Sequence, residues 1–311
     1  MDAQKSLIRE INTFYRRWAA HEKVLGKEGS PIFDFDYCPL DEADSQEPFE
    51  SRLAALEEVE RLLELVSSAP KIDFSNKDFL VLKLRGSTFY IRALLGERIS
   101  FSTFLEATVG ITPNRLSREF LQELREAAIE RVSQAAVDWS RSGLERYDSL
   151  TLYPQPDQFG SSLRELAKVW VHRVQSLLAL DVEPRYRIQT AVVDEYWHNW
   201  IDGKVGEDIL LRINTHPRVR FRRGDDHRLA AHEIAGHAIH ILSLSEQQKR
   251  GTIESCLMNT TAHTAEIFQF EGLAQSILHL LSEEDELPEE VRMNEAVKRY
   301  NAAVINNAQC A

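Results

Sequence analysis

The sequence is poor in cysteine and has no long apolar run. Its 311 residues include three cysteines, an odd number, at Cys38, Cys256 and Cys310. Small secreted domains depend on many paired cysteines, so we expect no disulfide scaffold and a reducing, cytoplasmic location. The apolar stretches fall short of the roughly 18 residues that a transmembrane helix needs, and the N-terminus lacks the apolar core of a secretory signal. We therefore expect no membrane partner.

Glycine, proline and positive charge are also scarce. The chain has 13 glycines and 10 prolines, too few for a collagen-like or low-complexity chain. Its 43% of hydrophobic residues exceeds what a disordered chain contains. Lysine and arginine number 37 against 49 aspartates and glutamates, which gives a net charge of -12. Because a negative protein repels the phosphate backbone, we expect no nucleic-acid partner.

Apolar residues of the first half recur at helical spacing. A first helix is predicted around Leu7 to Trp18, and residues 26–44, which contain glycines, prolines and aspartates, are typical of a loop. The segment 151–160, with two prolines and a closing glycine, is the strongest linker signal. We therefore predict two subdomains, a helical N-terminal one over residues 1–150 and a second over 151–311. The other helices predicted in this half span residues 47–67, 78–95, 101–109 and 117–142.

After a further predicted helix over residues 161–180, the pattern becomes β-branched and partly alternating. Residues 185–197 and 208–221 are predicted to form two strands, bridged by a turn, and the second of them is expected at the edge of its sheet. Three helices are predicted to follow, over residues 225–244, 252–282 and 287–307. The predicted fold class is mostly α, with a small β-sheet ahead of the last three helices.

The most informative segment is HEIAGH, from His232 to His237. Two histidines four positions apart on an α-helix reach one zinc ion, but a spacing of five leaves them about 140° apart on an ideal helix. One extra residue must therefore be absorbed in a π-type turn, in which backbone bonding runs from i to i+5. Gly236 lies inside this turn and lowers its steric cost.

The segment around this motif is apolar on nearly every side, from Leu229 to Leu242, which predicts a buried helix. A buried glutamate is costly unless it is paired or near a metal, so Glu233 favours a metal site or a polar network. The alternative is a chance pattern, in which Glu233 is solvated and His237 is an ordinary core histidine.

A third ligand is expected on the next predicted helix, which offers His263, Glu266 and Glu271. A carboxylate that joins two imidazoles gives the His₂Glu set of catalytic zinc sites. Apolar neighbours predict that Glu271 is buried, and Gly272 beside it is expected to permit close helix approach. Glu266 is the rival ligand, or a hydrogen-bond acceptor for a ligand histidine.

The HEIAGH block, followed by FEGLA at residues 270–274, resembles a known group of proteins. The second block is similar to the QEGLA motif of the tyrosine-carboxypeptidase-like family, with Phe270 in place of the glutamine. The first block also matches the HExxGH zinc motif of dipeptidyl peptidase III, although no EECRAE-like second motif is present. The likeness to the QEGLA family covers roughly residues 185–285.

The resemblance implies a helical, gluzincin-like zinc peptidase of the carboxypeptidase type. It implies that His232, His237 and Glu271 bind Zn²⁺, with Glu271 preferred over Glu266, and that Glu233 is the general base. The expected substrate is a peptide or protein terminus; the oligomeric state is left open. The alternatives are a zinc-dependent hydrolase or biosynthetic enzyme with a non-peptide substrate, or a non-catalytic helical metal-binding protein.

Three further expectations concern the surroundings of this site. Asp225 and Asp226 are expected to cap the metal helix. An arginine cluster over residues 218–228 suits a substrate C-terminal carboxylate or acidic tail, or else neutralises acidic helices. Its members are Arg218, Arg220, Arg222, Arg223 and Arg228. The residues weighed as oxyanion stabilisers, each with packing as the ordinary alternative, are Tyr196, His198, His240, Arg299 and Tyr300.

Overall fold

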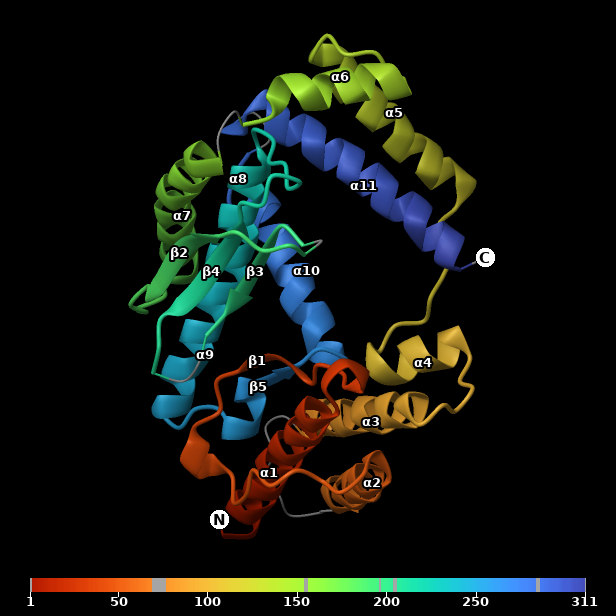
Figure 1. Ribbon diagram of the computed structural model, residues 1–311, viewed down its shortest axis with the longest axis vertical. Coiled ribbons are helices and arrows are strands. Elements are labelled where there is room, and N and C mark those ends of the chain that lie inside the picture. Colours follow the sequence, from red (N-terminus) through yellow and green to blue (C-terminus); the bar gives the residue numbers. More distant parts are fainter. Residues whose placement is uncertain are drawn as a thin grey trace. The chain divides into compact units, whose positions relative to one another are not determined.

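The computed structural model confirms the mostly helical class, with 64% helix and 9% strand (Figure 1). It describes residues 2–68, 77–153, 156–195, 197–203, 206–283 and 286–310. Within these residues, none of the helices combines the length and the apolar character needed to cross a lipid bilayer.

The chain divides into two compact units, and both are discontinuous in sequence. Unit 1 comprises Met1–Pro113, Gly203–Glu207 and Ser243–Gly272. Unit 2 comprises Asn114–Asp202, Asp208–Leu242 and Leu273–Ala311. The predicted boundary lay near residue 150, whereas the contacts group residues 114–150 with unit 2.

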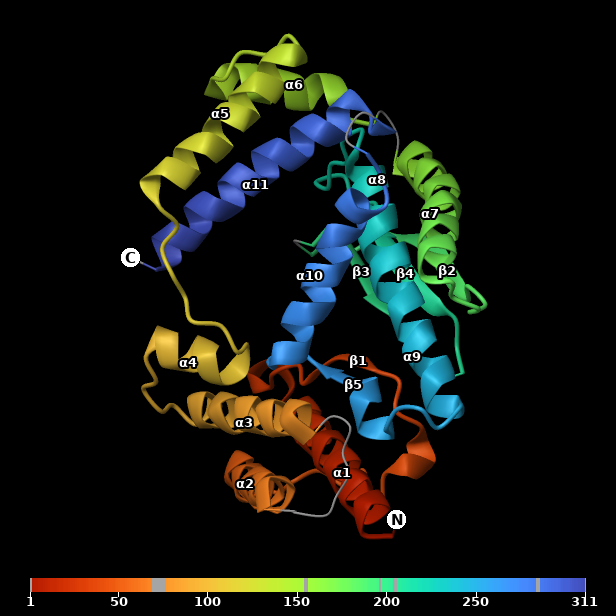
Figure 2. The same ribbon diagram turned by 180° about the vertical axis from the view of Figure 1, so that it is seen from behind.

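Unit 1 is built around the first helix. The large aromatic side chains of α1, Phe14, Tyr15 and Trp18, are buried in its core. Helix α3 packs against both α2 and α4, as Figure 2 shows. The helices are α1 (Asp2–Leu25), α2 (Arg52–Ser68), α3 (Lys77–Leu94) and α4 (Phe101–Thr108).

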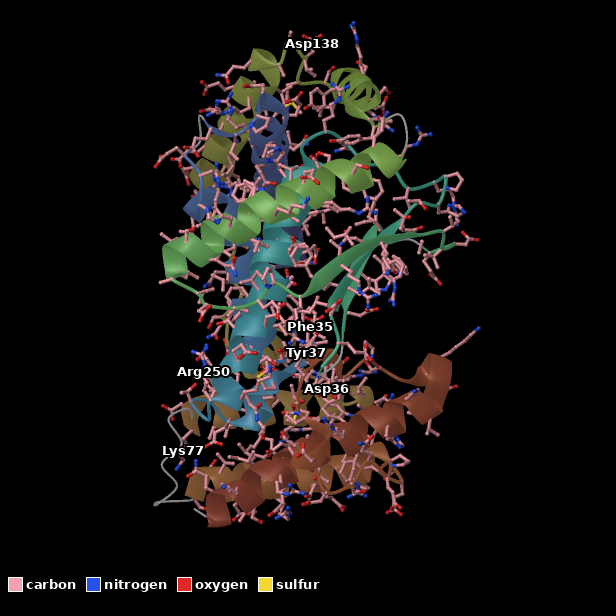
Figure 3. All side chains as sticks on the ribbon, turned by 90° about the vertical axis from the view of Figure 1, so that its left-hand side faces the viewer. Phe35, Asp36, Tyr37, Lys77, Asp138 and Arg250 are labelled. Carbon is pink, nitrogen blue, oxygen red and sulfur yellow. The ribbon has the colours of Figure 1, made fainter. Side chains whose placement is uncertain are left out.

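The predicted loop over residues 26–44 contains a strand that sequence reasoning missed. Strand β1 (Phe33–Asp36) pairs antiparallel with β5 (Asn259–Thr261), and Tyr37 N then donates to Met258 O at 3.0 Å. Figure 3 labels Phe35, Asp36 and Tyr37 in this segment. A four-residue strand whose partner lies more than 200 residues away leaves too little periodicity to detect. The short 3₁₀ turns of this unit are η1 (Gly26–Glu28), η2 (Leu40–Glu42) and η4 (Ser255–Met258).

Unit 2 begins with two helices where one long helix was predicted. The predicted helix over residues 117–142 is wrong, because Ala136 adopts a left-handed φ of 56° and ends the helical path. Two helices result, α5 (Arg118–Gln134) and α6 (Arg141–Thr151), whose N-cap serines are Ser117 and Ser140. Helix α11 (Glu289–Gln309) lies along α5 (Figure 1).

The sheet of unit 2 has three strands, in the order β2-β4-β3. Strand β4 (Ile209–Asn214) pairs in parallel with β2 (Tyr186–Ala191) and antiparallel with β3 (Asn199–Asp202). The expectation that the second predicted strand is an edge is therefore wrong: β4 is central, and its residues Ile209, Leu211 and Ile213 are fully buried. The edge strands are β2 and β3, and sequence reasoning had assigned β3 partly to a turn.

Three helical segments follow the sheet without a break in the chain. They are α8 (Asp225–Leu229), the π-helix η3 (Ala230–Ala238) and α9 (Ile239–Lys249). Helix α7 (Pro156–Leu178) packs across α8 and η3, as Figure 3 shows. The predicted helix over residues 252–282 is shorter than expected. The segment before it forms η4 and β5, and α10 spans Ala265–Leu280.

Candidate metal centre

The π-helix η3 carries the two histidines of the HEIAGH segment. The predicted i→i+5 geometry is present, and it extends over nine residues instead of a single turn. Eight of these residues are buried, His237 and Glu233 among them, and His232 is half-buried. The prediction of a buried, distorted helix is confirmed. The apolar sequence buries the helix, and the longer spacing is absorbed by π bonding.

The π geometry brings the two imidazoles to one point. His232 Nε2 and His237 Nε2 lie 3.2 Å apart, with their ring planes at 87°. Two zinc–nitrogen bonds of about 2.0–2.1 Å at a tetrahedral angle place their nitrogens about 3.3 Å apart. The separation therefore suits two ligands of one tetrahedral ion.

Glu271 of α10 completes this group. One ligand atom from each of His232, His237 and Glu271 lies within 4.8 Å of the others. Glu271 is half-buried, less buried than predicted. The donor set, two imidazoles and one carboxylate, is that of catalytic zinc sites with a fourth position left for water.

The position of Glu271 follows from how α10 packs on the π-helix. A Cβ built on Gly236 would stand 2.7 Å from both Cα and Cβ of Ala274, so these two backbones touch at a point where only glycine fits. Glu271 precedes Ala274 by about one helical turn. The expectation that Gly272 permits this approach is wrong, because a Cβ there would meet open space.

Glu266, the rival ligand, belongs to a different cluster. Its carboxylate is buried, lies 3.0 Å from the ammonium of the fully buried Lys83, and accepts hydrogen bonds from Thr261 N and Oγ1. His263 stacks on Tyr90 with ring centroids 4.3 Å apart, and burial lowers its pKa to about 3. Glu266 is thus engaged by Lys83 and Thr261, and His263 by Tyr90, so neither belongs to the group of His232, His237 and Glu271.

Glu233 accepts a hydrogen bond from Asn199, a residue that no sequence motif indicates. Asn199 Nδ2 donates to Glu233 Oε1 at 2.8 Å, and Glu233 is only 9% exposed. Asn199 is the first residue of β3, an edge strand of the three-stranded sheet. No motif links an asparagine to a glutamate 34 positions later, so only the tertiary fold reveals this contact.

A basic cavity of about 590 Å³ lies beside Asn199. Three of the five clustered arginines line it, together with Lys298 of α11, and the acidic group in its wall is Asp225. Lys298 Nζ lies 3.2 Å from Asp225, and burial, followed by the charge of Arg228, lowers the pKa of Lys298. Aromatic groups complete the wall. The lining residues include Arg220, Arg222, Arg228, Lys298, Asn199 and Trp197.

The remaining two arginines have other surroundings. Arg218 forms an ion pair with Asp194, and Arg223 is exposed. The predicted cap also differs. The N-cap residue of α8 is Gly224, with a φ of 92°, and Asp226 lies inside the first turn. Its carboxylate accepts hydrogen bonds from Tyr153 Oη at 2.6 Å and from the backbone of Gly224.

The residues weighed as oxyanion stabilisers are dispersed. His198 lines the basic cavity, whereas Arg299 lines a separate cavity of about 460 Å³. Tyr300 packs on Trp139 with centroids 5.9 Å apart, which is the ordinary packing alternative. On α9, burial lowers the pKa of His240 to about 4. Tyr196 lies outside the described residues.

No family model, curated protein or solved structure matches this chain. The likeness of the HEIAGH and FEGLA blocks to zinc peptidases therefore stays a prediction. The geometry brings together three side chains that could hold a metal ion, a buried carboxylate that accepts a hydrogen bond from Asn199, and a neighbouring basic cavity.

Proposed function

We propose that the protein is a zinc-dependent peptidase. The observation that carries the proposal is the convergence of His232, His237 and Glu271 from two helices, with the buried carboxylate of Glu233 on the same π-helix. These donors suit Zn²⁺ better than Mg²⁺ or Ca²⁺, because imidazole is a ligand that hard cations rarely use.

In this proposal, metal binding and proton transfer are carried out by different residues. His232, His237 and Glu271 would hold the ion, which when bound polarises a carbonyl and lowers the pKa of water. Glu233 accepts the proton of the attacking water at a carboxylate oxygen and passes it to the leaving amine. Burial of Glu233 keeps bulk water away from this proton transfer.

The basic cavity supports an exopeptidase of the carboxypeptidase type. Four cationic side chains and one acid line a cavity in a chain whose net charge is -12, so the cavity attracts an anionic group. The free carboxylate that ends every unmodified peptide is such a group, and guanidinium groups bind it in bidentate fashion. The cavity shares Asn199 with the environment of Glu233, which brings a bound terminus near the proposed base.

Glu233→Gln in the zinc-loaded protein tests the proposal. Glutamine keeps the size of the side chain and removes its basic oxygen, so hydrolysis of a peptide library should fall by about 10²–10⁴-fold. Zinc content, measured by mass spectrometry, should stay at one ion per chain. Glu165→Gln, which alters an exposed ion pair with Lys168, is the control and should leave both readouts unchanged.

Two results would overturn the proposal. If Glu233→Gln loses zinc, Glu233 is a ligand and the assigned roles are wrong. If the zinc-loaded wild type cleaves no peptide in the library, the protein is a metal-binding protein or acts on a different kind of substrate.

A further inference from the structure

Asn199 and Glu233 form a buried contact that joins β3, an edge strand, to the π-helix. The amide of Asn199 donates to one carboxylate oxygen, Oε1, of Glu233 at 2.8 Å. An amide donor and a carboxylate acceptor are matched in chemistry, and an ionised acceptor makes such a bond stronger than one between neutral groups. The contact therefore restricts the rotation of the Glu233 side chain.

Asn199 is itself held by the central strand. It pairs with Ile213 of β4, which is fully buried. The next residue, Asn214, is also fully buried and binds the segment before Asn199 twice. Its backbone N–H donates to His198 O at 2.8 Å, and its side-chain Nδ2 donates to Trp197 O at 3.0 Å.

The side-chain carbonyl oxygen of Asn214 also makes hydrogen bonds to backbone groups. Oδ1 accepts hydrogen bonds from the backbone N–H groups of Val193 at 3.2 Å and of His216 at 3.0 Å. Both ends of the Asn214 amide are thus bonded to backbone. The segment that leads into β3 is fixed from the centre of the sheet, so Asn199 approaches Glu233 from a rigid element and not from a loose loop.

We propose that Asn199 is a positioning residue for Glu233: it fixes the carboxylate so that Oε2 faces the attacking water. The inference rests on the proposed function, since it assigns a task to Asn199 only if Glu233 is the general base. A base must lie within hydrogen-bond reach of the proton that it takes, so a carboxylate that samples other rotamers loses rate without losing substrate affinity. Asn199 acts through Glu233 and carries no proton itself.

The first test is kinetic and uses the zinc-loaded full chain with peptide substrates. Asn199→Ala should lower kcat by about 10–100-fold, the range typical of lost outer contacts at metal sites, with KM and zinc content unchanged. Asn199→Asp should lower kcat further, because it replaces a donor with a second negative charge. Asn199→Gln, which keeps an amide donor, should recover part of the rate.

The decisive arm combines substitutions. In the Glu233→Gln background, Asn199→Ala should cause no further loss of kcat, because a positioning effect disappears with the group that it positions. A loss that multiplies with that of Glu233→Gln would overturn the proposal. A raised KM with unchanged kcat would also overturn it, because Asn199 would then be a substrate contact.

The second test needs no activity and uses the metal-free protein. Thermal midpoints are measured for Asn199→Ala, Glu233→Ala and the double variant. The midpoint shift of the double variant should be smaller than the sum of the single shifts, because both substitutions remove the same bond. Asn294→Ala is the matched control, since buried Asn294 donates to Arg223 O and not to Glu233. Its shift should add to that of Glu233→Ala.

The two tests separate the failure of this inference from the failure of the proposed function. If the wild type cleaves nothing, the peptidase proposal fails, and non-additive midpoints then show only that Asn199 orients Glu233. Additive midpoints overturn the positioning role whatever the activity.

Discussion

Gly236 of the π-helix and Ala274 of α10 lie in close contact, since a Cβ on Gly236 would lie 2.7 Å from two atoms of Ala274. The overlap is with a backbone atom, so Gly236→Ala must push the helices apart. We expect a loss of about 1–3 kcal/mol in the free energy of unfolding, the usual cost of overpacking. We also expect weaker zinc binding, because Glu271 moves with α10.

The matched control for this substitution is Gly272→Ala in α10. A Cβ there meets open space, and replacement of a helical glycine by alanine stabilises by about 0.5–1 kcal/mol. Urea unfolding and zinc content measure both variants. If Gly236→Ala is as stable as Gly272→Ala, the close contact does not hold α10 in place.

Zinc stoichiometry tests the two imidazoles. His232→Ala or His237→Ala should reduce zinc from one ion per chain to a trace, measured by mass spectrometry after dialysis, because two donors remain where catalytic zinc uses three. His279→Ala, which removes a histidine paired with Glu295 outside the centre, should keep its zinc. Full occupancy in either of the first two variants would contradict the site.

Substitution of the two glutamates of α10, Glu266 and Glu271, should affect different properties: zinc binding in one case and stability in the other. Glu271→Gln should lose zinc and keep its thermal stability, because it changes a half-buried donor of the metal group. Glu266→Gln should keep zinc and destabilise the fold by about 3–5 kcal/mol, because it leaves the buried ammonium of Lys83 without its charged partner. The opposite ranking of zinc contents would make Glu266 the ligand.

His263 should make stability depend on pH. Its pKa in the folded chain is lowered to about 3 by burial and by the charge of Lys83, below the ordinary value of 6.5. Between pH 3 and 6.5 the imidazole of His263 is therefore protonated in the unfolded chain and neutral in the folded chain. The free energy of unfolding is therefore unaffected by protonation of His263 above pH 6.5. It decreases by roughly 1 kcal/mol per pH unit as the pH falls from 6.5 towards 3. His263→Phe should flatten this slope in urea unfolding; an unchanged slope would assign it to other groups.

The basic cavity should distinguish peptides by their terminal charge. Arg228→Gln combined with Lys298→Gln should raise KM about tenfold for peptides with a free C-terminal carboxylate and leave it unchanged for C-terminal amides. Arg223→Gln removes an arginine that lies outside the cavity and is the control. Equal effects on both peptide types would remove the cavity from terminus recognition.

Helices with long apolar periodicity were predictable, and short strands were not. The predicted positions of α2, α3 and α4 agree with the structure within a few residues, because a repeat over several turns is a strong signal. The strands β1 and β3 have four residues each, and their partners are distant or central. Their existence depends on pairing, which a single sequence does not display.

The candidate site shows the same division between local and tertiary information. His232, His237 and the π geometry follow from spacing and burial within one segment. The preference for Glu271 depended on the FEGLA likeness. In the structure, Glu271 lies in the metal group and Glu266 pairs with Lys83. Asn199 was missed because it lies on another element and has no motif.

The spacing of five residues between His232 and His237 depends on the π-helix. When one residue is added to an α-helix of fixed length, the backbone can accommodate it through i→i+5 bonding. The π-helix η3 is equivalent to an α-helix with one such added residue. Deletion of Ala235 would restore a spacing of four between the histidines and remove the residue that the i→i+5 bonding accommodates. The spacing of the two histidines and the close contact of Gly236 with Ala274 therefore depend on the same nine-residue π-helix.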